Sequence, residues 1–285
     1  MYESFFELDE LPFELTPDPR FLWLSEAHQE GLASLYYGIT RRKGFILLTG
    51  EVGTGKTTLL RAAIDSIPRD VDTGVVLNTA ALTRIDLLKL IVTEFQIPGP
   101  FETKADYIIA LIAFLLERLR NNLNTVLIID EAQNLDLANL EEIRLLSNLE
   151  TDTEKLLQIV LTGQPELRRM MADPSLRQLR QRVAIEYNVE ALRPVEVAQY
   201  LAHRIEVAGG SYERIFAPGC ESAFYSFSGG CPRLVSLLAD RVLLAAFAKQ
   251  VRPIPPALVE SKVKEMIAAR HAGLPETEEP ESSRG

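Results

Sequence analysis

The chain has 285 residues, of which 47% are hydrophobic and 25% charged, and its net charge is −10. These values are typical of a globular protein with one large domain or two modest ones, and the acidic balance disfavours non-specific binding to nucleic acid. The longest apolar run, Ile108 to Leu116, is much shorter than the roughly 20 residues of a membrane helix. The acidic N-terminus lacks the basic start and apolar core of a signal peptide, so a cytoplasmic location is expected.

Residues 1–40 combine a proline-rich arm with a helix. Pro12, Pro17 and Pro19 favour extended backbone over helix in the arm. A helix is then predicted from about Glu26 to Gly38. Whether the arm contacts a ligand or only packs against the protein stays open.

An apolar strand, a glycine-rich turn and a helix follow one another after this arm. The strand is predicted over Phe45–Thr49 and the helix over Thr57–Ile64. Between them the sequence matches the phosphate-binding pattern G-x-x-x-x-G-K-[ST], in which several backbone N–H groups point at one anion. The residues expected to bind a nucleotide are Gly50, Glu51, Val52, Gly53, Thr54, Gly55, Lys56, Thr57 and Thr58.

Two side chains of this loop have predicted roles. Lys56 is expected to reach the β- and γ-phosphates of ATP, and the Thr57 hydroxyl to ligate Mg²⁺. The helix begins beneath the phosphates and adds the positive end of its dipole. A glycine-rich turn with a surface lysine is the simpler alternative, but the strand before the loop and the helix after it favour a nucleotide site.

A second buried strand is predicted over Val75–Asn78, and two helices follow it. Thr83 and Thr103, each with an aspartate three residues later, are expected to cap the N-termini of these helices. The periodicity of the first helix predicts one apolar face made of Ile85, Leu88, Val92 and Phe95.

Four apolar residues, Val126–Ile129, predict a strand buried on both faces, and two carboxylates follow it. Ligands of open parallel sheets bind at the carboxyl ends of the strands. Asp130 is therefore expected to hold Mg²⁺ through water, and Glu131 to orient and activate the water that attacks the γ-phosphate. A strand that ends in a solvated turn is the alternative, which the phosphate-binding loop earlier in the chain disfavours.

A fourth strand, Leu157–Thr162, and a fifth, Ala184–Tyr187, enclose an arginine-rich segment. Thr162 and Gln164 could both reach the γ-phosphate, and Gln164 is preferred. A guanidinium is planar, always charged and pairs with phosphate oxygens, so an arginine just before the fifth strand could project toward a neighbouring subunit's γ-phosphate. The candidates are Arg180 and Arg182, whereas Arg168 and Arg169 are expected on a solvated helical face.

Only helices are predicted from Leu192 onward. Arg233 lies in the first turn of one of them, where a cation is unfavourable against the helix dipole, so a nucleotide phosphate is a candidate partner. Residues 271–285 are rich in Pro, Glu and Ser and are expected to be disordered. Cys220 and Cys231 fit no metal-ligand spacing and are expected to be buried, reduced thiols.

Together these features resemble the AAA+ ATPases. The resemblance is closest to the general secretion pathway A (ExeA-type) branch, whose relatives act in pilus biogenesis and exopolysaccharide export. It covers nearly all of residues 1–270. Its motifs are residues 1–6, 12–13, 15–21, 50–58, 128–135, 145–151, 163–167, 176–183 and 229–234.

The resemblance implies a P-loop NTPase of the α/β class, in which helices flank a five-stranded parallel sheet. This nucleotide-binding domain would span residues 41–191, and a small helical lid would span residues 192–270. ATP and Mg²⁺ are the implied ligands. By resemblance, the Walker A residues are Lys56 and Thr57, the Walker B residues are Asp130 and Glu131, Gln164 lies near sensor 1, Arg182 or Arg180 is the arginine finger, and Arg233 is sensor 2.

The resemblance also implies partners. AAA+ subunits assemble head-to-tail into a ring, usually a hexamer, or into a helical homo-oligomer, and here Arg180 or Arg182 would complete a neighbour's site. A protein of an export machine is the expected partner. Some family members continue into a membrane helix and a peptidoglycan-binding domain that this sequence does not include, which disfavours a direct part in inserting a secretin through the cell wall. Peripheral association with a membrane complex is a further expectation.

Two alternatives belong to other functional classes. The branch is also similar to transposition-regulator ATPases, which polymerise on DNA and recruit a transposase. The acidic balance and the lack of a basic stripe disfavour this DNA-binding interpretation. The third candidate is a scaffold that binds ATP and barely hydrolyses it, which the water-activating Glu131 disfavours.

Overall fold

A computed structural model describes the chain as two compact units. The α/β unit comprises Leu24–Ala191, and the helical unit combines Met1–Trp23 with the chain from Leu192 onward. The four-part division expected from the sequence stays a prediction, and residues 273–285 of its tail lie outside the described residues. The described residues are 1–14, 18–68, 70–77, 79–152 and 154–272, with only the backbone described for 270–272.

The strands of the α/β unit are β1 (Phe45–Gly50), β2 (Val71–Val76), β3 (Asn124–Ile129), β4 (Gln158–Gly163) and β5 (Val183–Val189). Its helices are α2 (Glu26–Thr40), α3 (Lys56–Ser66), α4 (Arg84–Glu94), α5 (Lys104–Arg120), α6 (Leu137–Leu146), α7 (Pro165–Met171) and α8 (Arg177–Arg180), with 3₁₀ turns η2 (Ala132–Asn134) and η3 (Pro174–Leu176).

The helical unit contains α1 (Glu3–Phe6), η1 (Pro19–Phe21), α9 (Pro194–Val207), α10 (Tyr212–Ile215), α11 (Cys220–Ser228), α12 (Pro232–Lys249) and α13 (Pro256–Ala272). Within the described ranges of both units, no helix combines the length and the apolar character needed to cross a bilayer.

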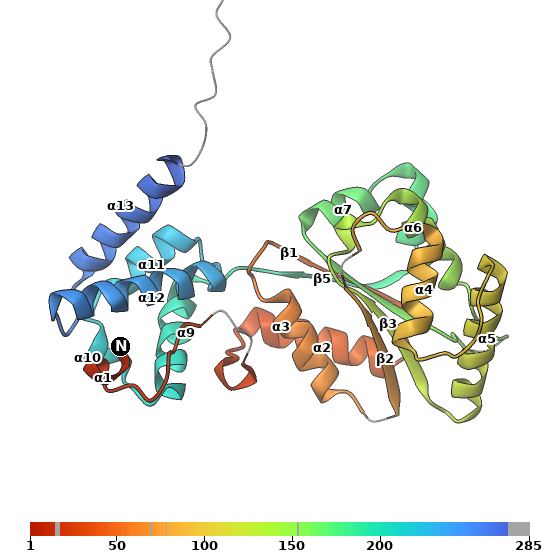
Figure 1. Ribbon diagram of the computed structural model, residues 1–285, viewed down its shortest axis with the longest axis horizontal. Coiled ribbons are helices and arrows are strands. Elements are labelled where there is room, and N and C mark those ends of the chain that lie inside the picture. The colour runs from red at the N-terminus through yellow and green to blue at the C-terminus, as the bar shows by residue number, and fades with distance from the viewer. Residues whose placement is uncertain (15–17, 69, 78, 153, 273–285) are drawn as a thin grey trace, which may run out of the picture. The chain divides into compact units, whose positions relative to one another are not determined.

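The five strands form one parallel sheet in the order β2-β3-β4-β1-β5 (Figure 1), which confirms the predicted sheet. In this order β4 lies between β1 and β3, although it follows both in sequence. The carboxyl ends of β1, β4 and β3 therefore lie side by side at one edge. That edge is where open parallel sheets bind their ligands.

The central strands are buried on both faces, and this explains their uninterrupted apolar runs. Successive side chains point to opposite faces, so Leu48 and Ile128 pack against α2 and α3. Leu47 and Leu127 pack on the other face, against residues of the helices from α4 to α8. The sheet is therefore held from both sides, which fixes the strand ends that carry the polar residues.

Two sequence-based details of the second strand and its helix are wrong. The strand begins at Val71 rather than Val75, because β2 is an edge strand whose partly buried residues include polar ones and make no apolar run. Ile85 is 48% exposed, because α4 buries Leu87 and Leu88 and each residue turns about 100° around a helix. Asn78, placed in the predicted strand, lies outside the described residues.

The predicted caps of the two following helices are confirmed. The Thr83 hydroxyl accepts the backbone N–H of Asp86, and the Asp86 carboxylate accepts the backbone N–H of Thr83. The same reciprocal pair joins Thr103 and Asp106 at the start of α5. Each box satisfies two backbone donors that the helix itself leaves unpaired.

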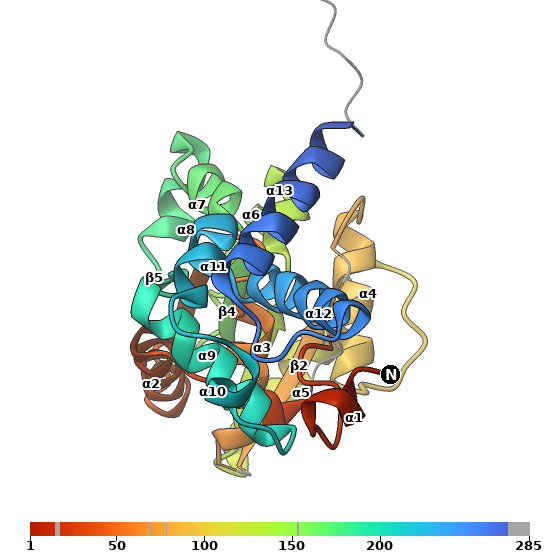
Figure 2. The ribbon, with the colours of Figure 1, turned by 90° about the vertical axis from the view of Figure 1, so that its left-hand side faces the viewer.

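The N-terminal arm is part of the helical unit (Figure 2). Phe6, Phe13 and Phe21 are buried in one apolar core with residues of α9, α11 and α12. The Tyr2 hydroxyl donates to Oδ1 of Asp240 over 2.6 Å. The Arg204 guanidinium lies over the rings of Phe13 and Phe21, 5.9 and 4.9 Å from their centroids. The described part of the arm therefore packs as a structural element, and whether it also contacts a ligand stays an open prediction.

Neither Cys220 nor Cys231 forms a disulfide. Cys220 is buried, and its thiol donates to the carbonyl oxygen of Ile254. Burial raises the pKa of the Cys220 thiol to about 11, so it stays neutral and unreactive at physiological pH. Cys231 is only half-buried, so the expectation of two buried thiols holds for Cys220 alone.

Loss of the Phe6 side chain should destabilise the helical unit. Phe6 is 1% exposed, and Phe→Ala changes at such positions cost about 3–5 kcal/mol. The only tryptophan of the chain, Trp23, lies in this unit with its ring centroid 6.3 Å from that of Tyr200. In urea unfolding followed by tryptophan fluorescence, Phe6→Ala should lower the midpoint clearly. Leu244→Ala, at a 48% exposed position in the same unit, should barely move it; equal midpoints for both variants would contradict the packing described.

Candidate nucleotide-binding and active site

The loop after β1 has the conformation that its glycines permit. Gly53 and Gly55 have positive φ angles of 81° and 100°, which residues with a side chain rarely adopt. The Thr54 hydroxyl donates to the carbonyl oxygen of Glu51 over 2.9 Å and closes the turn. Helix α3 then begins at Lys56, so its unpaired N–H groups face the loop. This is the backbone cradle that the sequence motif predicts.

Lys56 is oriented by the loop itself. Its side chain is only 5% exposed, and its ammonium group donates to the carbonyl oxygens of Gly50 and Glu51 over 2.8 and 3.0 Å. A buried ammonium needs such partners, because burial without them would penalise its charge. The positive charge is thus fixed at the mouth of the cradle, where phosphate oxygens would meet it.

Asp130 joins the ends of three strands. Its carboxylate follows β3, is 4% exposed, and accepts the hydroxyl of Thr57 at Oδ2 over 3.0 Å. Its Oδ1 atom accepts the hydroxyl of Thr162, which lies on β4. The carboxylate predicted as Walker B is therefore within hydrogen-bond reach of the hydroxyl predicted as Walker A.

The residues present suit Mg²⁺. A hydroxyl and a carboxylate in contact are the hard oxygen ligands that this ion prefers, and Mg²⁺ usually takes one or two such ligands and completes its shell with water and phosphate oxygens. Thr57 and Asp130 would hold it. Among the described residues no group of three or more His, Cys, Asp or Glu side chains could hold a metal ion, so an all-protein cage is not formed there.

Glu131 is held by hydrogen bonds to four residues. Its φ angle of 52° is unusual for a residue other than glycine, and its backbone is fixed by N–H donation to Asp130 and by the Thr79 hydroxyl on its carbonyl. The side chains of Gln164 and Gln133 both donate to Oε2 of its carboxylate, Gln164 over 3.1 Å. Strain and hydrogen bonds at one residue are typical of functional sites.

Thr162 and Gln164, the two sensor 1 candidates, contact different carboxylates. Thr162 is fully buried and bonds to Asp130, the carboxylate expected to hold Mg²⁺. Gln164 is partly exposed and bonds to Glu131, the carboxylate expected to activate water. The preference for Gln164 at the γ-phosphate stays a prediction.

Sequence reasoning missed several residues that shape this site. Gln133 connects Glu131 with Gln164, because its Nε2 donates to the Glu131 carboxylate and its Oε1 accepts the backbone N–H of Gln164 over 3.0 Å. His28 on α2 contacts the phosphate-binding loop at Thr54. Gln133 lies two residues after Glu131, so its closeness to the acidic pair could have indicated a role in the site. No residue near His28 in the sequence indicates its contact with the loop.

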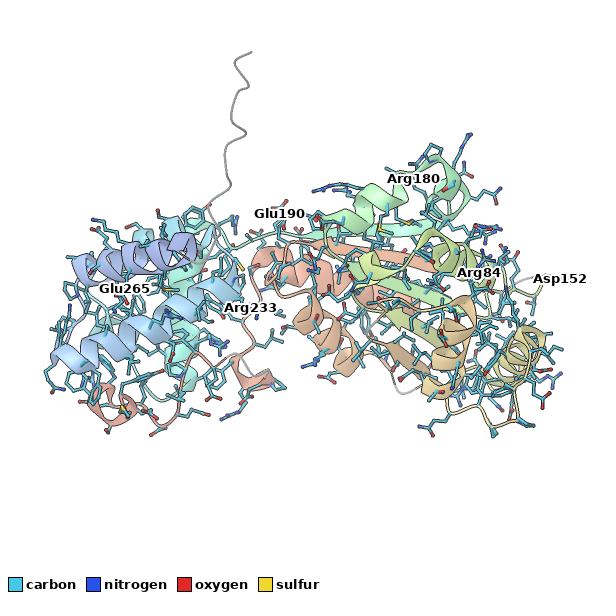
Figure 3. The ribbon with its side chains drawn as sticks, turned by 45° about the horizontal axis from the view of Figure 1, so that its top comes forward. Arg84, Asp152, Arg180, Glu190, Arg233 and Glu265 are labelled. Carbon is cyan, nitrogen blue, oxygen red and sulfur yellow. The ribbon has the colours of Figure 1, made fainter. Side chains whose placement is uncertain are left out.

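The three predicted arginines lie apart from the loop in the sequence, and their surroundings differ; Figure 3 labels Arg180 and Arg233. Arg180 is exposed at the end of α8, where its Nη1 donates to the carbonyl oxygen of Ala172 over 3.3 Å. Arg182 is half-buried, and its Nη1 donates to the carbonyl oxygen of Ser147 over 3.2 Å. Arg233 is exposed in the first turn of α12, in the helical unit. Their roles stay predictions.

Comparison with known sequences identifies one domain and one close relative. Residues 39–171 match the AAA domain family. The chain is 45% identical over 250 residues to general secretion pathway protein A of Aeromonas hydrophila. That match covers 87% of this chain but only 45% of the relative, so the chain spans less than half of the relative's length.

Solved structures share the fold at low sequence identity. Cdc6p of Pyrobaculum aerophilum superposes with a TM-score of 0.65 at 20% identity, over 91% of this chain and 75% of its own. The RuvB Holliday junction branch migration motor of Thermotoga maritima superposes with a TM-score of 0.57 at 18% identity, over 88% of this chain and 72% of its own. Both are similar in architecture to this chain.

Replacing Gln133 by methionine should slow ATP turnover more than it weakens ATP binding. The change removes a donor to the Glu131 carboxylate and an acceptor for the backbone of Gln164 while keeping the side-chain length. Hydrogen bonds to charged groups contribute about 1.5–3 kcal/mol, so kcat should fall roughly tenfold or more with KM nearly unchanged. Steady-state kinetics measure both. Gln199→Met, at an exposed position of α9, is the matched control, and wild-type kcat in Gln133→Met would contradict the role given to Gln133.

Proposed function

Because the chain belongs to the AAA+ ATPases and is related to general secretion pathway protein A, we propose that it is a Mg²⁺-dependent, oligomeric ATP-driven switch or assembly factor of a bacterial secretion, pilus or polysaccharide export system. The comparisons confirm the family and the ATP hydrolase class that the resemblance in the sequence implies. The metal dependence, the assembly and the pathway are the parts proposed.

The observation that carries the proposal is the hydrogen-bonded arrangement at the ends of β1, β3 and β4. Thr57 and Thr162 bond to one carboxylate, Asp130, and the next residue, Glu131, is held by Gln164. One chain thus brings together a phosphate cradle, a metal-binding pair and a carboxylate that can accept a proton from water. These are the parts that phosphoryl transfer to water needs.

The chain's own residues divide the work of hydrolysis. The loop N–H groups and Lys56 bind and orient the phosphates, and Thr57 with Asp130 holds the metal, which when bound neutralises charge on the β- and γ-phosphates. Glu131 orients the attacking water and takes its proton. Gln164, bonded to Glu131, keeps the carboxylate aimed and can donate to the γ-phosphate.

The proposed assembly depends on an arginine from a neighbouring subunit. Arg180 suits this role better than Arg182, because Arg180 is exposed, whereas Arg182 is half-buried and bonded to Ser147. We propose a head-to-tail ring, closed as a hexamer-like homo-oligomer, in which each Arg180 completes the next site. ATP would then favour assembly, since its γ-phosphate is the group that the arginine contacts.

The proposed location is the cytoplasm, with peripheral attachment to a membrane complex through a protein partner of the export machine. The DNA-binding transposition-regulator alternative stays a prediction. One structural neighbour, RuvB of Thermotoga maritima, is a Holliday junction branch migration motor. At 18% identity that neighbour indicates the shared fold and carries no argument for DNA binding by this chain.

Glu131→Gln should bind ATP but lose most hydrolysis, because the amide keeps the shape of the carboxylate but cannot accept the proton of the attacking water. Lys56→Ala should bind ATP poorly, because it removes the ammonium group at the cradle. Equilibrium binding of a fluorescent ATP analogue and phosphate release, each with and without Mg²⁺, separate the two effects. Hydrolysis by Glu131→Gln at the wild-type rate would overturn the role assigned to Glu131.

Mixing two inactive variants should restore activity if sites are shared between subunits. Arg180→Ala keeps an intact pocket and Lys56→Ala keeps an intact arginine, so a mixed interface can pair the two. An arginine finger contributes about 10³–10⁵ in rate, so each variant alone should be nearly inactive and the mixture measurably active. The wild-type rate per subunit should also rise with protein concentration. Arg169→Ala, at another exposed arginine, serves as the matched control; a concentration-independent rate with active Arg180→Ala would rule out the shared site.

A further inference from the structure

A buried histidine outside the motifs contacts the phosphate-binding loop. His28 lies in the first turn of α2, is 5% exposed, and places Nε2 2.8 Å from the carbonyl oxygen of Thr54. Its other ring nitrogen, Nδ1, lies 2.6 Å from the hydroxyl of Ser25, the N-cap of α2. A histidine from a helix that precedes the strand thus reaches the peptide between Thr54 and Gly55.

The partners of the ring assign its protons. The Thr54 carbonyl oxygen can only accept, so Nε2 carries a hydrogen and donates it. In the neutral ring Nδ1 is then an acceptor, and the Ser25 hydroxyl donates to it. The Ser25 oxygen in turn accepts the backbone N–H of His28 over 3.2 Å. Every polar atom of the pair therefore has a partner, and the chain of bonds ends on the loop.

Helix α2 provides a fixed base for this contact. A Cβ atom added to Gly31 would lie 2.8 Å from the Tyr187 ring, and one added to Gly38 would lie 2.5 Å from Ile46. The helix therefore lies very close to β5 and β1, and small residues on one face permit it. The Tyr187 hydroxyl also donates to the carbonyl oxygen of Ala27, next to His28. A side chain held on such a helix can position its partner.

The geometry of the peptide group determines what the contact between His28 and Thr54 does to the Gly55 N–H. In a trans peptide the C=O and the following N–H point in opposite directions. A donor that holds the Thr54 carbonyl on the α2 side therefore turns the Gly55 N–H to the opposite side, away from α2. Gly55 has a φ of 100°, and glycine can adopt many backbone conformations. Without the His28 donor, the Thr54–Gly55 peptide could therefore flip. A Cβ at Gly55 would also lie 3.0 Å from His28 Nε2, so a residue with a side chain at position 55 would crowd the histidine ring.

We propose that His28 is a positioning residue for nucleotide binding, which keeps the Thr54–Gly55 peptide in the orientation that presents the Gly55 N–H to the phosphates. His28 touches no reacting atom and acts only through the loop backbone. This inference rests on the proposed function in one respect, that the loop binds a nucleoside di- or triphosphate. The N–H groups of such loops cradle the α- and β-phosphates, so His28 should matter equally for ADP and ATP.

The test replaces the ring and then restores only its donor. His28→Phe keeps a flat ring of similar size but cannot donate, whereas His28→Gln can place an amide N–H near the position of Nε2. ADP and ATP affinities are measured by displacement of a fluorescent nucleotide, kcat is measured at saturating ATP, and thermal unfolding is recorded for every variant. His203→Phe, in α9 of the helical unit, is the matched substitution away from the loop.

We expect His28→Phe to weaken ADP and ATP binding by about tenfold each, the loss of one hydrogen bond, with kcat at saturation changed less than about threefold. His28→Gln should recover most of the affinity, and His203→Phe should bind as wild type. If His28→Phe binds nucleotide as tightly as wild type, or if His28→Gln and His28→Phe are equally weak, the inference is wrong. If the wild-type chain itself binds no nucleotide, the failure belongs to the proposed function instead.

Discussion

The rest of the site depends on the buried carboxylate of Asp130. It is the point where hydroxyls from the helix after β1 and from β4 meet the end of β3. A carboxylate that is 4% exposed is costly unless it is paired with donors or a cation, so the arrangement is stable only when the three strand ends are in register. The strand order β3-β4-β1 provides that register, because it places the two motif-bearing strands on either side of Thr162.

Much of this could be predicted because the signals are local. The loop of Gly50–Thr58 and the pair Asp130–Glu131 each lie within a few residues of an apolar strand, so the pattern alone predicts the element and its end. The Thr83 and Thr103 caps are predictable for the same reason, since all their partners lie within three residues. The start of β2 is not, because an edge strand lacks the apolar run that identifies a buried one.

The contacts that could not be predicted join residues far apart in sequence. His28 is 26 residues from Thr54, and Thr162 is 32 from Asp130. The sequence prediction grouped residues 1–40 as one arm and helix, yet the contacts group Met1–Trp23 with the helical unit and the following helix with the sheet. Periodicity identifies the helix α2 but cannot indicate which element covers its polar first turn.

The chain passes between its two units at two places, and hydrogen bonds hold the backbone or a side chain close to each of them. At Trp23–Leu24 it enters the α/β unit, directly before Ser25, whose bond to His28 continues to the phosphate-binding loop. At Ala191–Leu192 it enters the helical unit, where the Leu192 N–H donates to Gly230 just before the helix that carries Arg233. A Cβ on Gly230 would lie 2.0 Å from the Leu192 carbonyl oxygen, so only glycine permits this contact. Each crossing is thus tied by a hydrogen bond to a helix, or to a residue just before a helix, in the unit that it enters.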